Sequence, residues 1–168
     1  MGVRRWARSC PPCPGDLRWA NARPAMKFNL IDTVLEQSPD RIVAIKQVSL
    51  AEEYLADHFP TFPVLPGVLM LETMVQAARR LLSNRGETRL VLGAVKGLKF
   101  GSFVRPGETL TVDVTVTGSV DGTYECRGKG RVIRHNGGRP DETAVSGRFT
   151  MRPIRRTLPD ELMRPQEK

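Results

Sequence analysis

The sequence predicts a single α+β domain in which an antiparallel sheet wraps around one long buried helix. Its 168 residues suit one domain with a sizeable core. Residues 68–83 form the longest apolar stretch of helical length, and the residues after it consist of β-branched runs separated by Gly and Pro turns. A helix that is apolar on nearly every side must be covered on nearly every side. The strands that follow are the segments available to cover it.

The segment before the long helix predicts a strand, a short helical turn and a loop. Residues 41–48 are rich in β-branched side chains and follow a turn signal at residues 38–40, so they predict a strand. Residues 49–56 predict a short helical turn capped by Ser49, because Glu52 follows three positions later. Three prolines within residues 58–67 exclude a regular helix there and predict a loop.

Residues that are typical of turns bound the long helix and the strands after it. We expect the helix over residues 68–83, with Asn84-Arg85-Gly86 ending it. Beyond it, β-branched residues alternate with turns that contain Gly, Pro, Asn or Asp. The predicted strands are residues 90–95, 99–104, 109–117, 123–135 and 143–152.

Charge and composition distinguish a central domain from the two ends of the chain, both of which are basic. The net charge of +8 is concentrated in residues 1–25, with five Arg and one Asp, and in residues 152–168, with five basic and three acidic residues. We expect residues 1–25 to be a disordered leader or an over-long start that is never translated. Residues 26–152 then form the domain, and residues 153–168 form a flexible tail.

The same composition excludes several classes of protein. No block of Lys and Arg indicates a basic face, and aromatic residues make up only 6%, so we expect no nucleic-acid partner. The apolar run 64–82 contains Glu72, Gln76 and two Arg, so no segment predicts a membrane span. Three cysteines suit a reducing cytoplasm. Cys10 and Cys13 have C-x-x-C spacing but neither a strand beside them nor further ligands, so we expect no metal site.

Two polar residues on the long helix and one histidine before it are candidates for chemistry. Glu72 and Gln76 lie four residues apart and therefore share one helical face. A carboxylate in a buried helix is costly unless it is paired or functional, and the spacing alone leaves both roles open. His58, taken alone, is best read as a polar residue on a surface loop. Gly67, however, places a free amide at the positive end of the helix, where an oxyanion is favoured. His58, Glu72 and the Gly67 amide together could therefore form an acid/base site.

Residues 57–78 carry a resemblance to a known family. Their sequence, Asp-His-Phe-Pro-Thr-Phe-Pro-Val-Leu-Pro-Gly-Val-Leu-Met-Leu-Glu-Thr-Met-Val-Gln-Ala-Ala, resembles the signature of 3-hydroxyacyl-acyl-carrier-protein dehydratases of the FabZ type. The likeness extends to residues 41–46 before it and to residues 99–100 and 104–108 after it, and covers roughly residues 28–152.

The resemblance implies a fold, a reaction and roles for individual residues. It implies the hot-dog fold and a homodimer, or a trimer of dimers, with each site at a subunit interface. His58 would remove the C2 proton of a 3-hydroxyacyl thioester, and Glu72 of the other chain would protonate the departing hydroxyl. The Gly67 amide would polarise the thioester carbonyl, and Gln76 would hold Glu72. The residues expected to form the acyl tunnel or its loop are Phe59, Phe62, Pro66 and Val68.

The resemblance also implies the partner and the product. The substrate would be an acyl chain linked through phosphopantetheine to acyl carrier protein, in fatty acid or related lipid biosynthesis, and no cofactor would be needed. Glutamate at position 72 favours simple dehydration to the trans-2-enoyl product. The alternatives are a coenzyme A thioester hydratase or thioesterase, and a non-catalytic acyl-binding hot-dog module; retention of both His58 and Glu72 argues against the latter.

Overall fold

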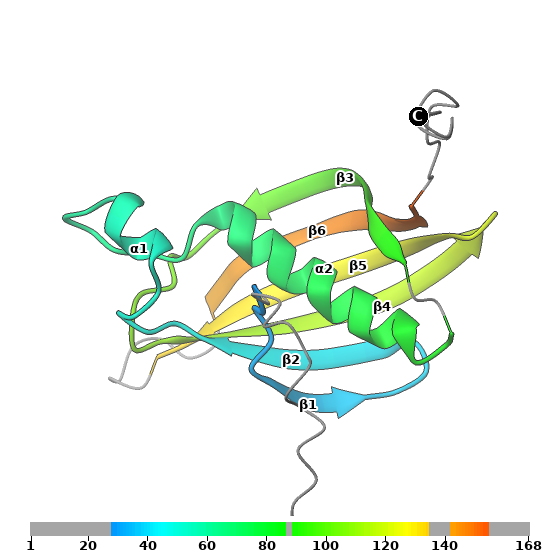
Figure 1. Cartoon of the computed structure of the whole chain (residues 1–168), viewed down its shortest axis with the longest axis horizontal. Coiled ribbons are helices and arrows are strands. Elements are labelled where there is room, and N and C mark those ends of the chain that lie inside the picture. The colour runs from blue at the N-terminus through cyan, green and yellow to red at the C-terminus, as the bar shows by residue number, and fades with distance from the viewer. Residues whose placement is uncertain (1–27, 87–88, 135–141, 155–168) are drawn as a thin grey trace, which may run out of the picture.

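The computed structural model, which describes residues 28–86, 89–134 and 142–154, contains a six-stranded antiparallel sheet and one long helix that lies across one face of it (Figure 1). The strand order is β1-β2-β4-β5-β6-β3. The α+β class and the sheet curled around one helix are therefore confirmed. The predicted leader, the Cys10–Cys13 pair and residues 155–168 of the predicted tail lie outside the described residues.

The elements follow the predicted order, with one additional strand at the start and one strand fewer after the long helix. They are β1 (Thr33–Gln37), β2 (Arg41–Gln47), α1 (Tyr54–Asp57), α2 (Gly67–Ser83), β3 (Leu90–Phe100), β4 (Thr109–Val120), β5 (Thr123–Ile133) and β6 (Glu142–Pro153). The β4–β5 hairpin closes through Asp121 and Gly122, whose φ angles of 49° and 72° match the two-residue turn that Asp-Gly favours.

Two local expectations were wrong, and one strand was not predicted. Residues 90–104 do not form two strands: β3 is continuous, because bulges, one of them at Gly97 with φ 60°, let it keep pairing with β6. The short helix begins at Tyr54, later than expected, and Ser49 does not cap it; Glu53 occupies the N-cap position without a side-chain hydrogen bond. β1 had no clear sequence signal, since its five residues are almost all exposed.

Helix α2 packs its buried side against the concave face of the sheet. Its residues from Met74 to Leu82 include six that are essentially inaccessible to solvent: Met74, Val75, Ala77, Ala78, Leu81 and Leu82. Gly128 of β5 faces this helix, and a Cβ atom there would lie 2.5 Å from the Met74 sulfur. Glycine at this inward position therefore lets the helix lie close to the sheet.

α2 is buried or half-buried at all but three of its positions, so the expected cover is largely present. The exposed positions are Val68, which is 71% exposed, Arg80 and Ser83. Leu71 and Glu72 are half-buried. Within the described ranges, no helix has both the length and the apolarity needed to cross a membrane.

Candidate active site

His58 lies at the end of α1, where the chain turns into the proline-rich loop. Its backbone N–H donates to the Tyr54 carbonyl at 3.1 Å and closes the short helix. Its half-buried ring stacks obliquely on Phe59, with 4.3 Å between the ring centroids. Phe59 has φ 55°, a left-handed conformation that is unfavourable for a bulky residue. The backbone strain at Phe59 therefore accompanies the reorientation of the chain directly after His58.

A buried ion pair fixes the segment that carries His58 to the sheet. Lys46 of β2 is only 5% exposed, and its Nζ lies 2.6 Å from a Glu52 carboxylate oxygen and 3.8 Å from Asp32. Tyr54 begins α1 beside this cluster, and burial, followed by the Glu52 charge, raises the pKa of its hydroxyl. Because Glu52 lies just before α1, the Lys46–Glu52 pair ties that helix to β2.

Gly67 is the first residue of α2, and Phe100 of β3 covers its α-carbon. A Cβ atom at Gly67 would lie 2.9 Å from the Phe100 ring, so the close approach requires glycine. Pro66 occupies the N-cap and contributes no N–H, while its carbonyl accepts from Leu69 and Met70. The first N–H groups of a helix have no intrahelical acceptor, so the Gly67 amide is available to a ligand oxygen.

His58 and Gly67 line one cavity of about 370 Å³. Phe59, Pro66 and Val68 line it as well, whereas Phe62 does not. The Phe62 ring instead contacts Phe103, at 5.6 Å between centroids, and Phe103 does line the cavity. The remaining lining residues are Val64, Leu65, Met70, Phe100, Gly101, Ser102 and Ala144. The lining is mostly apolar apart from the imidazole and one hydroxyl, as an acyl chain requires.

Glu72 lies on α2 but does not line this cavity. Its Oε1 accepts a hydrogen bond from the Gln76 amide at 3.1 Å and lies 3.8 Å from an Arg79 guanidinium nitrogen. The expected Gln76–Glu72 contact is therefore present. The chain nevertheless does not bring His58 and Glu72 into one cavity, although they are only fourteen positions apart in the sequence.

Gln76 makes two further contacts that the sequence did not reveal. Its Oε1 accepts from the Leu30 N–H at 2.8 Å, and its Nε2 also donates to the Phe28 carbonyl at 3.1 Å. One amide thus holds the Glu72 carboxylate and the extended segment before β1. This segment crosses α2 and buries Leu30 and Ile31.

Several lining residues come from segments that sequence reasoning did not assign to the site. Phe100 is the last residue of β3, Ser102 and Phe103 follow it, and Ala144 belongs to β6. The resemblance at residues 99–100 was the available signal for Phe100. In the part of the chain that the structure describes, no group of His, Cys, Asp and Glu has the arrangement of a metal site.

Solved structures share the fold at low sequence identity. The dehydratase heterocomplex ApeI:P from Xenorhabdus doucetiae aligns with a TM-score of 0.56 at 17% identity, covering 82% of this chain and 90% of that chain. An acyl-CoA hydrolase from Bacillus cereus aligns with a TM-score of 0.55 at 18% identity, covering 70% and 68%. These neighbours confirm the hot-dog architecture.

Curated relatives share more of the sequence, and their names match the resemblance at residues 57–78. A 3-hydroxyacyl-[acyl-carrier-protein] dehydratase FabZ of Thermotoga petrophila is 37% identical over 105 residues, or 62% of this chain and 77% of that relative. The FabZ of Clostridium perfringens is 35% identical over 118 residues, or 61% of this chain and 84% of that relative. The family model described as "ApeI-like: ApeI dehydratase" matches residues 34–135, which is more than half of the chain. The chain therefore belongs to the ApeI-like dehydratase family.

Proposed function

We propose that this protein dehydrates 3-hydroxyacyl thioesters carried by acyl carrier protein to trans-2-enoyl thioesters, in fatty acid or related lipid biosynthesis. The family and the names of its FabZ relatives support the reaction class. The observation that carries the proposal is the shared cavity of His58 and Gly67, because it presents a base and a helix N-terminal amide to one apolar ligand. We expect the reaction to take place in the cytoplasm.

The geometry suits removal of a proton next to a thioester carbonyl. With the carbonyl oxygen at the Gly67 amide, the imidazole of His58 takes the C2 proton, and the negative charge that develops on the oxygen is stabilised by the amide and the helix dipole. The C3–O bond then breaks, and Glu72, acting as the general acid, gives a proton to the hydroxyl, which leaves as water. Return of the proton from His58 to Glu72 through solvent restores both groups.

A homodimer would bring the partner's Glu72 to His58. Glu72 lies outside the cavity of its own chain, so that cavity holds a base without an acid. Residues that border the cavity are exposed in the single chain: Phe59, Phe100 and Phe103 are each 54% exposed and Val68 is 71% exposed. β3, an eleven-residue edge strand that ends at Phe100, offers unpaired backbone groups beside them. Pairing at this edge covers the exposed rings and forms two symmetric sites.

The proposal is tested with a 3-hydroxyacyl chain presented on acyl carrier protein and on coenzyme A. We expect conversion to the 2-enoyl thioester, and hydration of the enoyl form in reverse, with higher kcat/KM for the carrier-linked substrate. Preference for coenzyme A would identify a hydratase of coenzyme A thioesters. Release of free thiol would identify a thioesterase, and acyl binding without turnover would identify a non-catalytic module.

A further inference from the structure

Arg79 is a cation on the same side of α2 as Glu72 and Gln76. The three residues are spaced by four and by three positions, so their side chains lie along one face of the helix. A guanidinium nitrogen of Arg79 lies 3.8 Å from Glu72 Oε1, the same oxygen that accepts a hydrogen bond from the Gln76 amide at 3.1 Å. One carboxylate oxygen therefore has two neighbours, one neutral and one charged.

Arg79 is also attached to the sheet. Its Nε donates a hydrogen bond to the carbonyl of Leu90, the first residue of β3, at 3.2 Å. Leu90 is buried, so this carbonyl belongs to a part of the backbone that is fixed by packing. A guanidinium group is planar and rigid, and a contact at Nε therefore limits where its other nitrogens can lie. Arg79 thus links the Glu72 carboxylate to the start of β3.

Glu72 is held from two sides, and each side has its own anchor. Gln76 is anchored on the backbone of the segment before β1, and Arg79 is anchored on Leu90. A glutamate side chain on a helix surface otherwise exchanges among several rotamers. The two contacts favour one of these orientations over the others.

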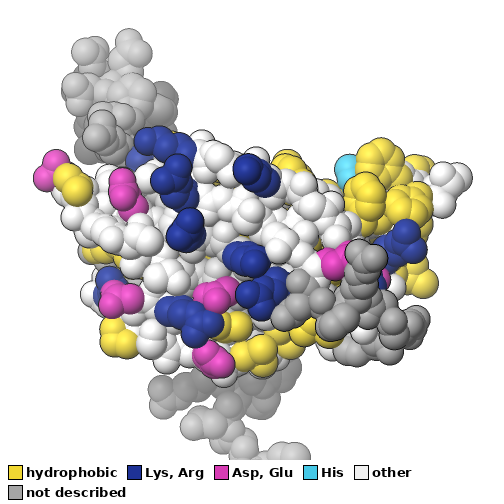
Figure 2. All heavy atoms as spheres, turned by 180° about the vertical axis from the view of Figure 1, so that it is seen from behind, with side chains coloured by type: hydrophobic (Ala, Val, Ile, Leu, Met, Phe, Trp, Pro, Cys, Tyr) yellow, Lys and Arg dark blue, Asp and Glu magenta, His cyan; other side chains and the backbone are white. Residues whose placement is uncertain are grey.

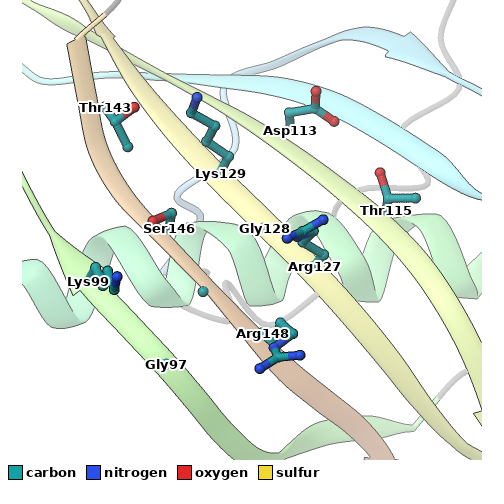
Figure 3. A pocket seen from close by; sticks show the side chains of 11 residues that line it. Gly97, Lys99, Asp113, Thr115, Arg127, Gly128, Lys129, Thr143, Ser146 and Arg148 are labelled. Atoms are coloured by element: carbon teal, nitrogen blue, oxygen red, sulfur yellow. The ribbon is translucent and has the colours of Figure 1, made fainter.

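Other basic residues of the domain gather on the opposite side of the sheet. Arg127 and Lys129 of β5 are exposed there, and Arg148 of β6 lies opposite Arg127. Figure 2 shows this face, and Figure 3 shows the three side chains around an open hollow of about 780 Å³. The expectation that no folded face concentrates basic residues was therefore wrong, because the strand period of two aligns residues that are dispersed in sequence. This face carries none of the candidate site residues, so its cations serve as controls for charge alone.

The exposure of the Arg79–Glu72 pair determines which property it can affect. The two side chains are 40% and 34% exposed, and solvent screens such a pair so that it contributes little to the stability of the fold. Proton transfer is more sensitive to geometry, because the carboxyl must lie within hydrogen-bond reach of the oxygen that it protonates. A displacement of about 1 Å can lower a rate by roughly 10²-fold. The contact should therefore matter for turnover and hardly for folding.

We propose that Arg79 is a positioning residue that orients the Glu72 carboxyl for protonation of the departing hydroxyl. The inference rests on the proposed function. Arg79 acts through Glu72 and does not bind the substrate, so it affects kcat rather than KM. Because its anchor lies on β3, the edge strand at which we propose that two subunits pair, Arg79 also connects the orientation of the acid to that edge.

The test uses a 3-hydroxyacyl pantetheine thioester, because a substrate without a carrier excludes effects on carrier binding. We expect Arg79→Gln to lower kcat about three- to tenfold, with KM within about twofold of wild type and Tm unchanged. Arg79→Lys keeps the charge without the planar group and should fall between the two. Arg80→Gln removes the same charge from the next, exposed position, and Arg148→Gln removes it from the opposite face of the sheet. Both controls should resemble wild type.

The background of Glu72→Gln distinguishes positioning from a general structural role. If Arg79 acts through the carboxyl, adding Arg79→Gln to Glu72→Gln lowers kcat no further, because the group that it orients is already lost. A general structural role would lower kcat by the same factor in both backgrounds. Single-turnover measurements with enzyme in excess give the residual rates of the Glu72→Gln variants.

Several outcomes would overturn the inference while leaving dehydration established. They are an Arg79→Gln enzyme with wild-type or higher kcat, an equal loss in Arg80→Gln, a change confined to KM, and the same fractional loss of kcat in the Glu72→Gln background. Full turnover in Glu72→Gln itself would also overturn it, because Arg79 would then have no acid to orient. Failure of the wild type to convert the pantetheine thioester and the carrier-linked substrate would overturn the proposed function, and the inference with it.

Discussion

At the residue scale, the proposed chemistry depends on an imidazole and a carboxyl that have different surroundings. His58 lies in an apolar cavity against Phe59, whereas Glu72 contacts the polar groups of Gln76 and Arg79. We expect His58→Ala and Glu72→Gln each to lower kcat by roughly 10²–10⁴, the range for general acid/base groups, with Tm close to wild type. Steady-state dehydration kinetics with thermal melts measure both. Near-wild-type turnover in either variant would contradict the role assigned to that residue.

Cys126 gives a prediction for alkaline pH. Burial raises the pKa of its thiol to about 12, so above about pH 9 the unfolded chain loses this proton while the folded chain keeps it. The free energy of unfolding should therefore fall as pH rises from about 9 to about 12, at roughly 1 kcal/mol per pH unit from this group. Denaturant unfolding of wild type and Cys126→Ala between pH 8 and pH 11 measures the two slopes.

The comparison with Cys126→Ala isolates the thiol. Tyr54, whose pKa is also raised by burial, adds an alkaline slope that is common to both proteins. The alanine variant should be less stable at pH 8 but lose less stability on going to pH 11. Equal slopes in the two proteins would mean that Cys126 ionises as readily in the folded state as in the unfolded one.

The sequence predicts the site residues that lie close together in the chain but not those that the sheet brings to them. His58, Gly67 and Glu72 lie within fifteen positions, where spacing and the resemblance indicate them directly. Phe100 and Ala144 join the cavity only because β3 pairs with β6. Such long-range register depends on the folded sheet and is not encoded in any local pattern.

At the element scale, the glycines on the inner face of β5 determine how closely its neighbours pack. A Cβ atom at Gly130 would lie 2.6 Å from Val145 and 3.0 Å from Leu110, both buried. We expect Gly130→Ala to lower the free energy of unfolding by about 1–3 kcal/mol, the usual cost of overpacking a core. Gly118→Ala is the matched control, since its nearest neighbour would lie 3.9 Å away. Chemical denaturation of both variants tests this; equal stabilities would show that the core around β5 adjusts freely.

Element boundaries could be predicted well where one local signal dominates. Proline at 66 and the Asn84-Arg85-Gly86 run delimit α2, and the observed helix differs from the predicted one by a single residue. β3 was divided wrongly because Gly97 reads as an interruption in sequence. In the sheet it forms a bulge that pairing with β6 accommodates. β1 was not recognised because its exposed side chains carry no alternating pattern.

At the scale of the whole molecule, the proposed shared site would make activity a property of two chains. If His58 of one protomer works with the partner's Glu72, mixing inactive His58→Ala and Glu72→Gln chains by unfolding and refolding should restore activity. Each mixed dimer has one intact site, so random exchange gives up to about a quarter of wild-type activity per subunit if the sites act independently. No recovery, despite heterodimers demonstrated by mass spectrometry, would place both residues of each site on one chain.

The amide of Gln76 connects the beginning of the folded domain to Glu72. Because this one side chain binds Phe28 O and Leu30 N as well as the Glu72 carboxylate, the segment before β1 supports the residue that we propose as the proton donor. On this proposal, the position at which an expressed chain begins affects catalysis. A start or fusion junction upstream of residue 26 should preserve kcat. One that removes residues 28–30 should lower kcat even where the sheet still forms, so a comparison of truncation variants must include kinetics as well as yield and melting.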